Sequence, residues 1–521
     1  MLENGAPYSF EGHEALMAIA EDKHPYLTIV KSAQVGATAL LIGWALFSAA
    51  AGARVIYYLP DDTLLPDHTG LRVKPVIDNI PWLAAMVGNR DAVQTVNINR
   101  GVVHNLGLRS KLAKFNRPAD KEIFDEVDRA DERDVFTAFS RIEHSADPGI
   151  IFCSTPTLPG FGISRRYDET SDARTLLVRC PVCGKDTARA WLGGVVGREG
   201  DYDYALLDRE WSEGCGRDIR VHCLNCGRPL APDLPAEWVV SQPGRDYHGY
   251  KVGPLDIGRH PVSRYWLEFK GIIGNEGLMS IFLNERLGLA YAAAGAQLDV
   301  GHLDAIKGDY FPLDRCAEPC VLGADIGQSA GHRWGVLRLG AKLAVIAAGE
   351  ADWPQLDALY ARYNLVGAVL DGRPETAKAI EFQRKHPNVY LAEYAADAGG
   401  VSLDVKERDD VGGRVRWVRL DRTLACDRLV AAIRARELAL PKNASTLGNA
   451  VPGKPYGSFY GELMAPAREY VKAKIPPYVR AVWREGAAAD HYFHALVYAL
   501  AAVNLAGRGV SAAFSTNFET W

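Results

Sequence analysis

Four cysteines in two CxxC pairs carry the most specific chemical signal in the sequence. The pairs are Cys180-Pro-Val-Cys183 and Cys223-Leu-Asn-Cys226, and each is followed by a glycine. A CxxC turn presents two thiolates to one ion, and tetrahedral Zn²⁺ takes four such donors. We therefore expect one structural Zn²⁺ at Cys180, Cys183, Cys223 and Cys226. Cys215 and His222 lie nearby, so an exchange of ligands with either stays open, and unrelated buried thiols are the alternative.

The segment KSAQVGAT, residues 31–38, is a candidate phosphate-binding loop. It follows a strand-like run and precedes an apolar helix-like run, a context in which backbone N–H groups and a helix N-terminus can hold phosphates. Against the pattern GxxxxGK[ST], Gly36 and Thr38 are present, but Lys31 replaces the first glycine and Ala37 replaces the lysine. Nucleotide chemistry here would need Lys31 to fold back over the loop, with the Thr38 hydroxyl on Mg²⁺. An ordinary strand-to-helix turn is the alternative.

Two adjacent acids, Asp125 and Glu126, end a later strand-like run. One carboxylate can hold Mg²⁺ while its neighbour polarises the attacking water. A solvated helix start is the alternative, because acids favour the first turn of a helix. Further on, Ser154 and Thr155 precede Pro156 at the tip of the next strand-like run, where motor ATPases carry a sensor of the γ-phosphate.

Three more acids follow or precede regular elements in the second half of the chain. Asp325 and Asp371 each end an apolar strand-like run, and Asp490 precedes a helix-like run. Acids so placed can converge on a pair of Mg²⁺ or Mn²⁺ ions about 4 Å apart and hydrolyse a phosphodiester, as in an RNase H-like sheet. Helix capping is the alternative role for each of them.

Residues 410–420, between the second and third of these acids, have the signature of a β-hairpin with Gly412 and Gly413 at the turn. A group of arginines makes this region basic, which suits either a nucleic-acid backbone or a solubilising surface. The arginines are Arg414, Arg416, Arg419 and Arg422.

The elements that must position these residues follow an α/β pattern. Strand-like and helix-like runs alternate over 25–156, which is typical of a parallel sheet. Residues 174–247 show no long helical pattern and indicate an inserted zinc module, and 442–475, rich in Gly, Pro and Ala, is predicted to be loop. The other predicted strands are 320–325, 334–339, 342–346 and 365–370, and the other predicted helices are 263–273, 278–287 and 487–505.

Composition limits the classes of protein that the sequence can encode. The 521 residues are 48% apolar, which at roughly 150 residues per domain indicates two to four folded units. Nine cysteines are too few for a disulfide framework, and the net charge of −5 gives no global field for nucleic acid. The longest apolar stretch, 38–55, is interrupted by Gly and Arg, and no secretory signal is visible. We therefore expect a cytoplasmic protein without a membrane segment.

Taken in order, these motifs resemble the large terminase subunit of tailed double-stranded DNA phages, of the lambda-type, GpA-like family. The resemblance runs from about Tyr26 to Val503 and includes the stretches 282–288 and 495–502. It implies an ASCE-type P-loop ATPase with a parallel sheet and a zinc-binding insertion, followed by an RNase H-like α/β nuclease domain. The implied boundaries are 1–172 for the ATPase core, 173–247 for the insertion, 248–315 for a lid or linker, 316–506 for the nuclease and 507–521 for a C-terminal tail.

The resemblance also implies residue roles. The family places a lysine at the first position of its deviant loop, as Lys31 is here. Nucleotide and Mg²⁺ would be bound by Lys31, Ser32, Gln34, Gly36, Thr38 and Asp125. Glu126 would be the catalytic base, Ser154 and Thr155 the coupling motif, and Asp325, Asp371 and Asp490 the nuclease metal ligands. Arg129 and Arg141 are candidates for an arginine finger.

The implied activity is an ATP-driven motor that moves viral DNA into the procapsid and an endonuclease that cuts the concatemer. The implied cofactors are ATP, Mg²⁺ or Mn²⁺, and Zn²⁺. The implied partners are double-stranded DNA, a small terminase subunit and the portal protein, with a ring of identical chains during packaging in the host cytoplasm. A helicase-like DNA-remodelling ATPase without nuclease activity and an inactive prophage remnant that only binds DNA are the alternatives.

Overall fold

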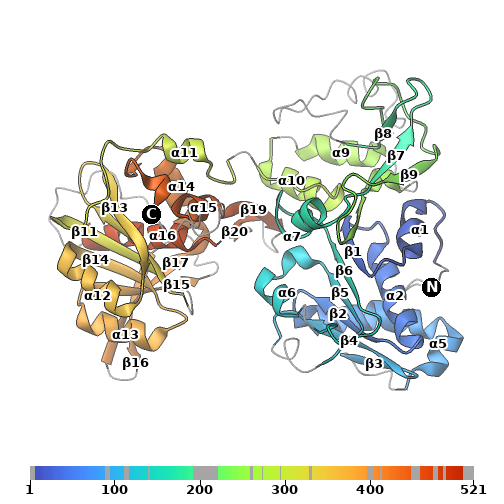
Figure 1. Ribbon diagram of the computed structural model, residues 1–521, viewed down its shortest axis with the longest axis horizontal. Coiled ribbons are helices and arrows are strands. Elements are labelled where there is room, and N and C mark those ends of the chain that lie inside the picture. The colour runs from blue at the N-terminus through green and yellow to red at the C-terminus, as the bar shows by residue number, and fades with distance from the viewer. Residues whose placement is uncertain are drawn as a thin grey trace. The chain divides into compact units, whose positions relative to one another are not determined.

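The computed structural model describes residues 6, 8–88, 94–110, 117–138, 141–191, 221–257, 262–272, 274–293, 295–327, 331–395, 403–410, 413–447, 458–472, 479–484 and 489–507. The chain divides into two compact units, Met1–Ala292 and Ala293–Trp521 (Figure 1). The boundary expected between 315 and 316 therefore falls inside the second unit. No helix in the described ranges combines the length and apolar character that a membrane crossing needs.

A seven-stranded sheet forms the centre of the first unit, in the order β10-β1-β6-β5-β2-β4-β3. Every neighbouring pair is parallel except β3 with β4. The parallel core confirms the predicted α/β class. The strands are β1 (Tyr26–Lys31), β2 (Arg54–Leu59), β3 (Thr95–Ile98), β4 (Gly101–Gly107), β5 (Lys121–Asp125), β6 (Gly149–Ser154) and β10 (His248–Val252).

Both faces of this sheet are buried, because its central strands are apolar on both sides. Ile29 lies in one core cluster with Leu41, whereas the next residue, Val30, lies in a second cluster with Phe124. Gly101 lets the chain approach the helix below it, since a Cβ there would lie 2.1 Å from the Ala49 carbonyl oxygen. The helices of this unit include α1 (Glu14–Glu21), α2 (Ala37–Ala50), α3 (Leu65–Asp67), α4 (Lys74–Asp78), α5 (Pro81–Met86), α6 (Glu132–Ala138), α7 (Gly162–Arg165), α9 (Val262–Ile272) and α10 (Glu276–Ile281), followed by the π-helical turn η7 (Phe282–Arg286).

The predicted zinc module contains a small antiparallel sheet in the order β8-β7-β9. Its strands are β7 (Thr175–Arg179), β8 (Asp186–Ala188) and β9 (Ala236–Val239). Within the described part of 174–247 there is no helix, as the sequence predicts. The next strand, β10, was expected in a lid or linker segment but instead extends the main sheet beside β1. Five residues of mixed polarity show too little periodicity to reveal this pairing.

An eight-stranded sheet forms the second unit, in the order β16-β17-β15-β14-β11-β12-β13-β18. β11, β12 and β13 form an antiparallel meander, and β14 and β15 continue in parallel from β11. The strands are β11 (Cys316–Asp325), β12 (His332–Arg338), β13 (Leu343–Ala351), β14 (Tyr363–Asp371), β15 (Val389–Ala395), β16 (Leu403–Asp410), β17 (Gly413–Asp421) and β18 (Leu438–Ala439).

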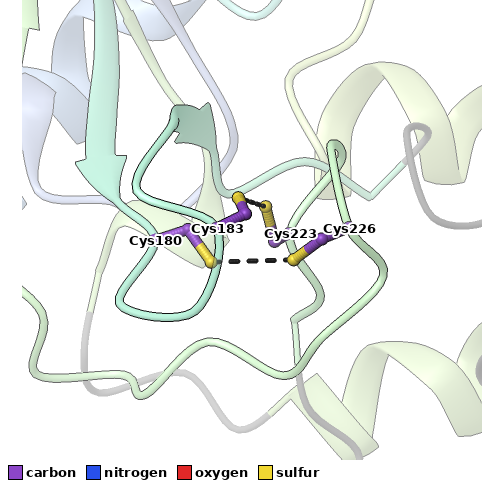
Figure 2. Close-up of side chains that lie close together, drawn as sticks. All are labelled: Cys180, Cys183, Cys223 and Cys226. Atoms are coloured by element: carbon purple, nitrogen blue, oxygen red, sulfur yellow. Dashed lines mark hydrogen bonds between the residues drawn. The ribbon is translucent and has the colours of Figure 1, made fainter.

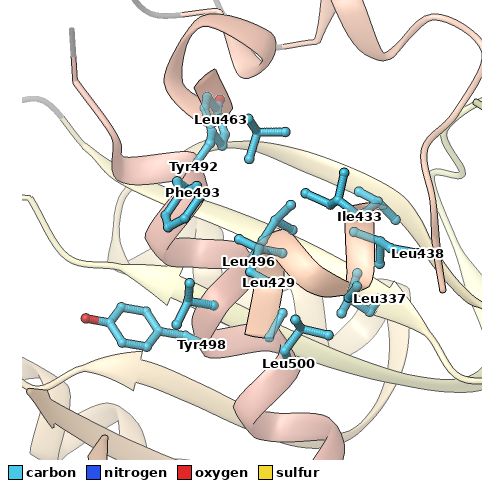
Figure 3. Packing of buried hydrophobic residues seen from close by; sticks show 14 of the residues in the cluster. Leu337, Leu429, Ile433, Leu438, Leu463, Tyr492, Phe493, Leu496, Tyr498 and Leu500 are labelled. Carbon is cyan, nitrogen blue, oxygen red and sulfur yellow. The ribbon is translucent and has the colours of Figure 1, made fainter. Parts of the chain in front are cut away.

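The last helix, α16 (His491–Gly507), packs on one face of this sheet together with α14 (Arg422–Arg434). Figure 3 shows Phe493 and Leu496 of α16 against Leu429 of α14 in this core. Gly323 of β11 permits the close approach, because a Cβ there would lie 2.0 Å from the Ala495 carbonyl oxygen. The opposite face is covered by α12 (Trp353–Arg362) and α13 (Thr376–Lys385) (Figure 1).

The prediction of loop over 442–475 is wrong in two places. The segment contains α15 (Phe459–Met464) and β19 (Ala467–Lys472), and β19 pairs with β20 (Val479–Arg484). The Ser458 hydroxyl caps α15 by accepting from the Gly461 N–H at 3.0 Å. Elements of six residues are too short to show a period among Gly and Pro. The remaining short helix of this unit is α11 (Val300–Asp304).

Candidate functional site

The candidate phosphate loop joins β1 to α2 at the carboxyl edge of the first sheet. Gly36 has φ of 90° and Gln34 has φ of 64°, so the loop turns through the left-handed region before α2 begins at Ala37. The Ser32 hydroxyl is buried and has no hydrogen-bond partner among the described residues. A buried donor without a partner fits a loop that receives an anion such as a phosphate.

Lys31 and Glu126 meet although 95 residues separate them. Lys31 Nζ lies 2.6 Å from Glu126 Oε1, and the Lys31 side chain is 6% exposed. Burial alone would lower the pKa of Lys31, but the charges of Glu126 and Asp125 raise it above its ordinary value. Burial alone would raise the pKa of Glu126, but the Lys31 cation lowers it. Both groups are therefore charged.

Asp125 lies next to this pair at the end of β5. Its carboxylate accepts a hydrogen bond from the Tyr57 hydroxyl at 2.7 Å, and the Thr38 hydroxyl is near enough to oppose the rise of its pKa. Burial raises the pKa of Asp125. Thr38 and Asp125 are therefore side by side, as a shared Mg²⁺ would require. Tyr57 was not predicted for this site.

The end of β6 contributes the two hydroxyl residues that the sequence singled out. Thr155 Oγ1 donates to Glu126 Oε2 at 3.3 Å. The Ser154 hydroxyl accepts from the Asp128 N–H at 3.2 Å and donates to the Thr155 carbonyl at 2.9 Å. Thr155 thus contacts the candidate base directly, whereas Ser154 supports the turn that follows it.

Asp128 organises this turn and was not predicted as a functional residue. Its carboxylate accepts from the Thr157 N–H at 2.9 Å and from the Ile163 N–H at 2.6 Å. Burial raises the pKa of Asp128 to about 7. Gly162 leaves room for the carboxylate, since a Cβ there would lie 2.3 Å from Asp128 Oδ1. Asp128 therefore links the turn that follows β5 to the segment that follows β6.

Of the two arginine candidates, Arg129 is the one that lies beside the acids of this site. Its Nε atom lies 3.8 Å from Glu126 Oε2, and its Nη2 atom lies 3.7 Å from Glu285 Oε1. Glu285 belongs to η7, and its carbonyl accepts from the Ala33 N–H of the phosphate loop at 2.6 Å. The charge of Arg141 instead acts on Glu122, whose pKa it lowers against the effect of burial.

The four predicted cysteines lie together in one cluster (Figure 2). The Sγ atoms of Cys180 and Cys226 are 3.8 Å apart, as are those of Cys183 and Cys223. Four thiolates about 2.3 Å from a central Zn²⁺ would be about 3.8 Å from one another, so the donor set fits the ion in type and spacing. Gly184 and Gly227 both have φ of 68°, which gives the two CxxC turns the same shape.

The described residues settle which nearby side chains join this cluster. Among them, the four cysteines are the group of His, Cys, Asp and Glu ligand atoms within 4.8 Å of one another, and His222 is not part of it. Cys215 lies outside the described residues. The neighbouring strands supply a small apolar core, in which Val178 and Leu230 pack against Cys180 and Cys223.

Asp325 and Asp371 end the neighbouring parallel strands β11 and β14, and Asp490 precedes α16. Burial and then the charge of Asp325 raise the pKa of Asp371 to about 7. Two unpredicted histidines are paired with the other two acids. His491 Nδ1 lies 2.6 Å from Asp325 Oδ2, and His494 Nε2 lies 3.3 Å from Asp490 Oδ2.

The charge of Asp325 acts on Asp371, but the three acids do not form a closed ligand set in this structure. Within the described part of the chain, their carboxylate oxygens do not all lie within 4.8 Å of one another. The Tyr394 hydroxyl lies 2.6 Å from His494 Nδ1, so the histidine is held between Tyr394 and Asp490. A metal here would replace the contacts that His491 and His494 make with the acids.

The arginine-rich segment forms the predicted hairpin, with β16 antiparallel to β17. Its turn residue Gly412 lies outside the described residues. Arg414 is paired with Glu407 at 3.2 Å and Arg419 with Glu393 at 3.5 Å. These acids offset part of the positive charge that the sequence suggested for nucleic-acid binding.

Residues 3–233 match a protein family described as the phage terminase large subunit gpA, ATPase domain. This part of the chain belongs to that family. The resemblance stated from the sequence motifs is therefore confirmed. No curated protein matches the chain.

Several solved structures of terminases are similar at low identity. The HK97 bacteriophage large terminase is 9% identical with a TM-score of 0.47, and the match covers 95% of each chain. The large terminase of a thermophilic bacteriophage, in complex with ADP, is 11% identical with a TM-score of 0.32, covering 94% of this chain and 98% of that one. The human cytomegalovirus terminase nuclease domain is 8% identical with a TM-score of 0.23, covering 39% of this chain and 91% of that one.

The terminase ATPase segment brings together most of the residues that its motifs predicted. Lys31, Asp125, Glu126 and Thr155 are linked by direct hydrogen bonds, and Thr38 lies beside Asp125. The sequence missed Tyr57 and Asp128, which support Asp125 and the β6 turn. A polar residue in the middle of an apolar strand was the available signal for Tyr57, and no local signal marked Asp128 among several neighbouring acids.

Proposed function

We propose that this chain is a large terminase subunit that couples ATP hydrolysis to the translocation of double-stranded DNA into a procapsid and cuts the DNA with a metal-dependent nuclease. The family of residues 3–233 supports the motor part of this proposal. The observation that carries it is the 2.6 Å contact between Lys31 Nζ and Glu126 Oε1. It joins the lysine of an unusual phosphate loop to the acid required beside the attacking water.

Hydrolysis would begin when Lys31 leaves Glu126 and donates instead to the phosphate oxygens of ATP. Thr38 and Asp125 would hold Mg²⁺, which when bound offsets the charge that develops on the phosphates. Glu126, freed from Lys31 and oriented by Thr155, would accept the proton of the attacking water. Ser32, Gln34 and Gly36 would line the loop around the phosphates.

We assign Zn²⁺ to Cys180, Cys183, Cys223 and Cys226. The support is the 3.8 Å spacing of the opposing sulfur atoms, which suits a tetrahedral site. Four thiolates leave no position for substrate, so the ion would hold β7, β8 and β9 together where only a small apolar core is available.

The nuclease proposal rests on the strand ends of the second unit, an RNase H-like arrangement. Asp325, Asp371 and Asp490 would bind Mg²⁺ or Mn²⁺, which when bound stabilises the attacking and leaving oxygens of a phosphodiester. The charge coupling between Asp325 and Asp371 supports a shared site. His491 and His494 would keep Asp325 and Asp490 in position until the ion arrives.

The partners proposed with this function are a small terminase subunit, the portal protein and other copies of this chain in a ring, in the host cytoplasm.

One experiment separates the proposal from its alternatives. Purified protein is incubated with supercoiled plasmid and Mn²⁺, and ATPase activity is measured with and without DNA. Cleavage together with DNA-stimulated ATPase supports a terminase. ATPase without cleavage supports a DNA-remodelling motor, and neither activity supports an inactive remnant.

A further inference from the structure

Two cysteines at the start of β11 have no role in the proposed function. The segment reads Cys316-Ala-Glu-Pro-Cys320, and both thiols are free. Cys316 is partly exposed, whereas Cys320 is fully buried in the core that α12 and α13 cover. Four residues apart on a regular strand, two side chains would be about 13 Å apart and could not react with each other.

The backbone register shows that this strand is not regular. Cys316 pairs with Tyr363 of β14, Pro319 pairs with Asn364, and Cys320 pairs with Leu365. Four steps along β11 are therefore matched by only two steps along β14, and residues 317–318 form a bulge. Two strand steps span about 6.6 Å, which is within the range of about 4.4–6.8 Å between the Cα atoms of a disulfide.

Hydrogen bonds of the two thiols and of the backbone stabilise the bulge. The Cys316 and Cys320 thiols both donate to the Glu318 carbonyl, at 3.9 and 3.3 Å respectively, so the two sulfur atoms gather around one oxygen atom. The bulge is held in place from both neighbouring strands. Asn364 Nδ2 donates to the Ala317 carbonyl at 3.1 Å, and the Leu339 N–H donates to the Pro319 carbonyl at 2.9 Å.

We propose that Cys316 and Cys320 form a redox modification site, at which a hydroperoxide converts the two thiols into a reversible disulfide. The Cys316 thiolate attacks one peroxide oxygen, the O–O bond breaks, and a sulfenic acid and one molecule of water or alcohol result. The Cys320 sulfur then attacks the Cys316 sulfur, the S–O bond breaks, and water leaves as the S–S bond forms. Two electrons pass from the thiols to the peroxide, and a small dithiol reverses the reaction.

The order of these steps follows from the surroundings of the two sulfur atoms. Burial raises the pKa of the Cys320 thiol to about 12, so this thiol supplies little thiolate, whereas the partly exposed Cys316 can meet the oxidant. The crosslink would fix the register at the start of β11 and β14. A slip of one residue between these strands would displace Asp325 relative to Asp371 at their other ends.

The test uses the full chain, treated with hydrogen peroxide, alkylated under denaturing conditions and digested with trypsin. Cleavage after Arg315 and Arg333 places Cys316 and Cys320 in one peptide, 316–333, which contains no other cysteine. We expect this peptide to lose two hydrogen atoms and to take up no alkyl group after peroxide treatment. Dithiothreitol before alkylation should restore two alkyl groups.

Two single variants and an internal control make the outcome specific. C316S and C320S should each leave the other thiol unable to close the crosslink, with unchanged thermal midpoints showing that both variants fold. Cys426, which is buried in the other core of this unit, should stay alkylated throughout. A wild-type peptide 316–333 that remains doubly alkylated after peroxide overturns the proposal, as does oxidation of Cys316 to sulfinic acid without loss of the Cys320 thiol.

Discussion

The charged ends of Lys31 and Glu126 lie 2.6 Å apart and neutralise each other. In the proposed mechanism, Lys31 donates to the phosphate oxygens of ATP, whereas Glu126 accepts the proton of the attacking water. Under the proposed roles, binding of ATP would have to open this ion pair, because neither task is compatible with the contact between Lys31 and Glu126. The pair would then keep Glu126 occupied until phosphate oxygens compete for Lys31.

Replacing Lys31 with alanine should abolish ATP hydrolysis and leave the fold intact. The sequence has Ala37 where a lysine is usual, so no second cation can take over on the loop. Phosphate release by purified Lys31→Ala is the measurement, with the exposed Lys23→Ala as the matched control. Turnover like that of the unmodified chain would remove Lys31 from the site.

Glu126→Gln keeps the shape of the side chain and removes the base. Nucleotide should still bind, while turnover falls by about 10²- to 10⁴-fold, as is typical for loss of a general base. Binding is measured with a fluorescent ATP analogue and turnover by phosphate release. The exposed Glu143→Gln serves as the control. If turnover does not change, Glu126 is only the ion-pair partner of Lys31.

One zinc ion per chain should be present in freshly purified protein and should disappear when Cys223 and Cys226 are both changed to serine. Because structural zinc contributes directly to folding free energy, this double variant should lose the local fold of β7, β8 and β9 and become less soluble. Elemental analysis measures the metal, and Cys316→Ser should keep it. Unchelated wild-type protein without zinc would contradict the assignment.

Asp325→Ala, Asp371→Ala and Asp490→Ala should each lose plasmid cleavage in Mn²⁺ and retain ATPase activity, because the two sites lie in different units. Gel analysis of plasmid nicking gives the cleavage rate. The exposed Asp314→Asn controls for removal of a surface acid. A variant that still cuts at the wild-type rate would show that its acid is not a metal ligand.

Stability should depend on pH through Glu122, a fully buried residue of β5. Burial raises its pKa from 4.5 to about 8, against the effect of the hydrogen bond from Tyr58. Between these two values the native chain holds a proton that the unfolded chain has released, so the free energy of unfolding falls as pH rises through this window. At pH 5 the effect is small, and by pH 8 it is on the order of 3 to 5 kcal/mol.

Glu122→Gln removes this titration. Urea unfolding of Glu122→Gln and the unmodified chain should therefore give similar stabilities near pH 5, and the variant should be the more stable near pH 8. Glu143→Gln, at an exposed position, should show no such divergence. A constant difference between Glu122→Gln and the parent across this range would mean that Glu122 is ionised in the native state.

The sequence was sufficient to predict structure and candidate site together where one short segment contains both a strand or turn and its candidate residue. β1 with Lys31, β5 with Asp125 and the CxxC turns are segments of this kind, since apolar runs and tight turns leave local patterns. The sequence was insufficient where a role arises from pairing across the fold. His491 becomes a partner of Asp325 only because α16 packs on β11, and the bulge at Cys316 exists only in its register with β14.

The pairing of β10 with β1 has a mechanical consequence. The chain leaves the cysteine cluster through β9 and then enters β10, which is bonded to β1 from Leu27 opposite His248 to Lys31 opposite Val252. The Ser32 N–H continues this ladder by donating to the Val252 carbonyl at 3.0 Å. A pull on the module of β7, β8 and β9 along the chain would load these bonds in shear, a geometry in which they resist together. The candidate phosphate loop is thus tethered to any force that reaches this module.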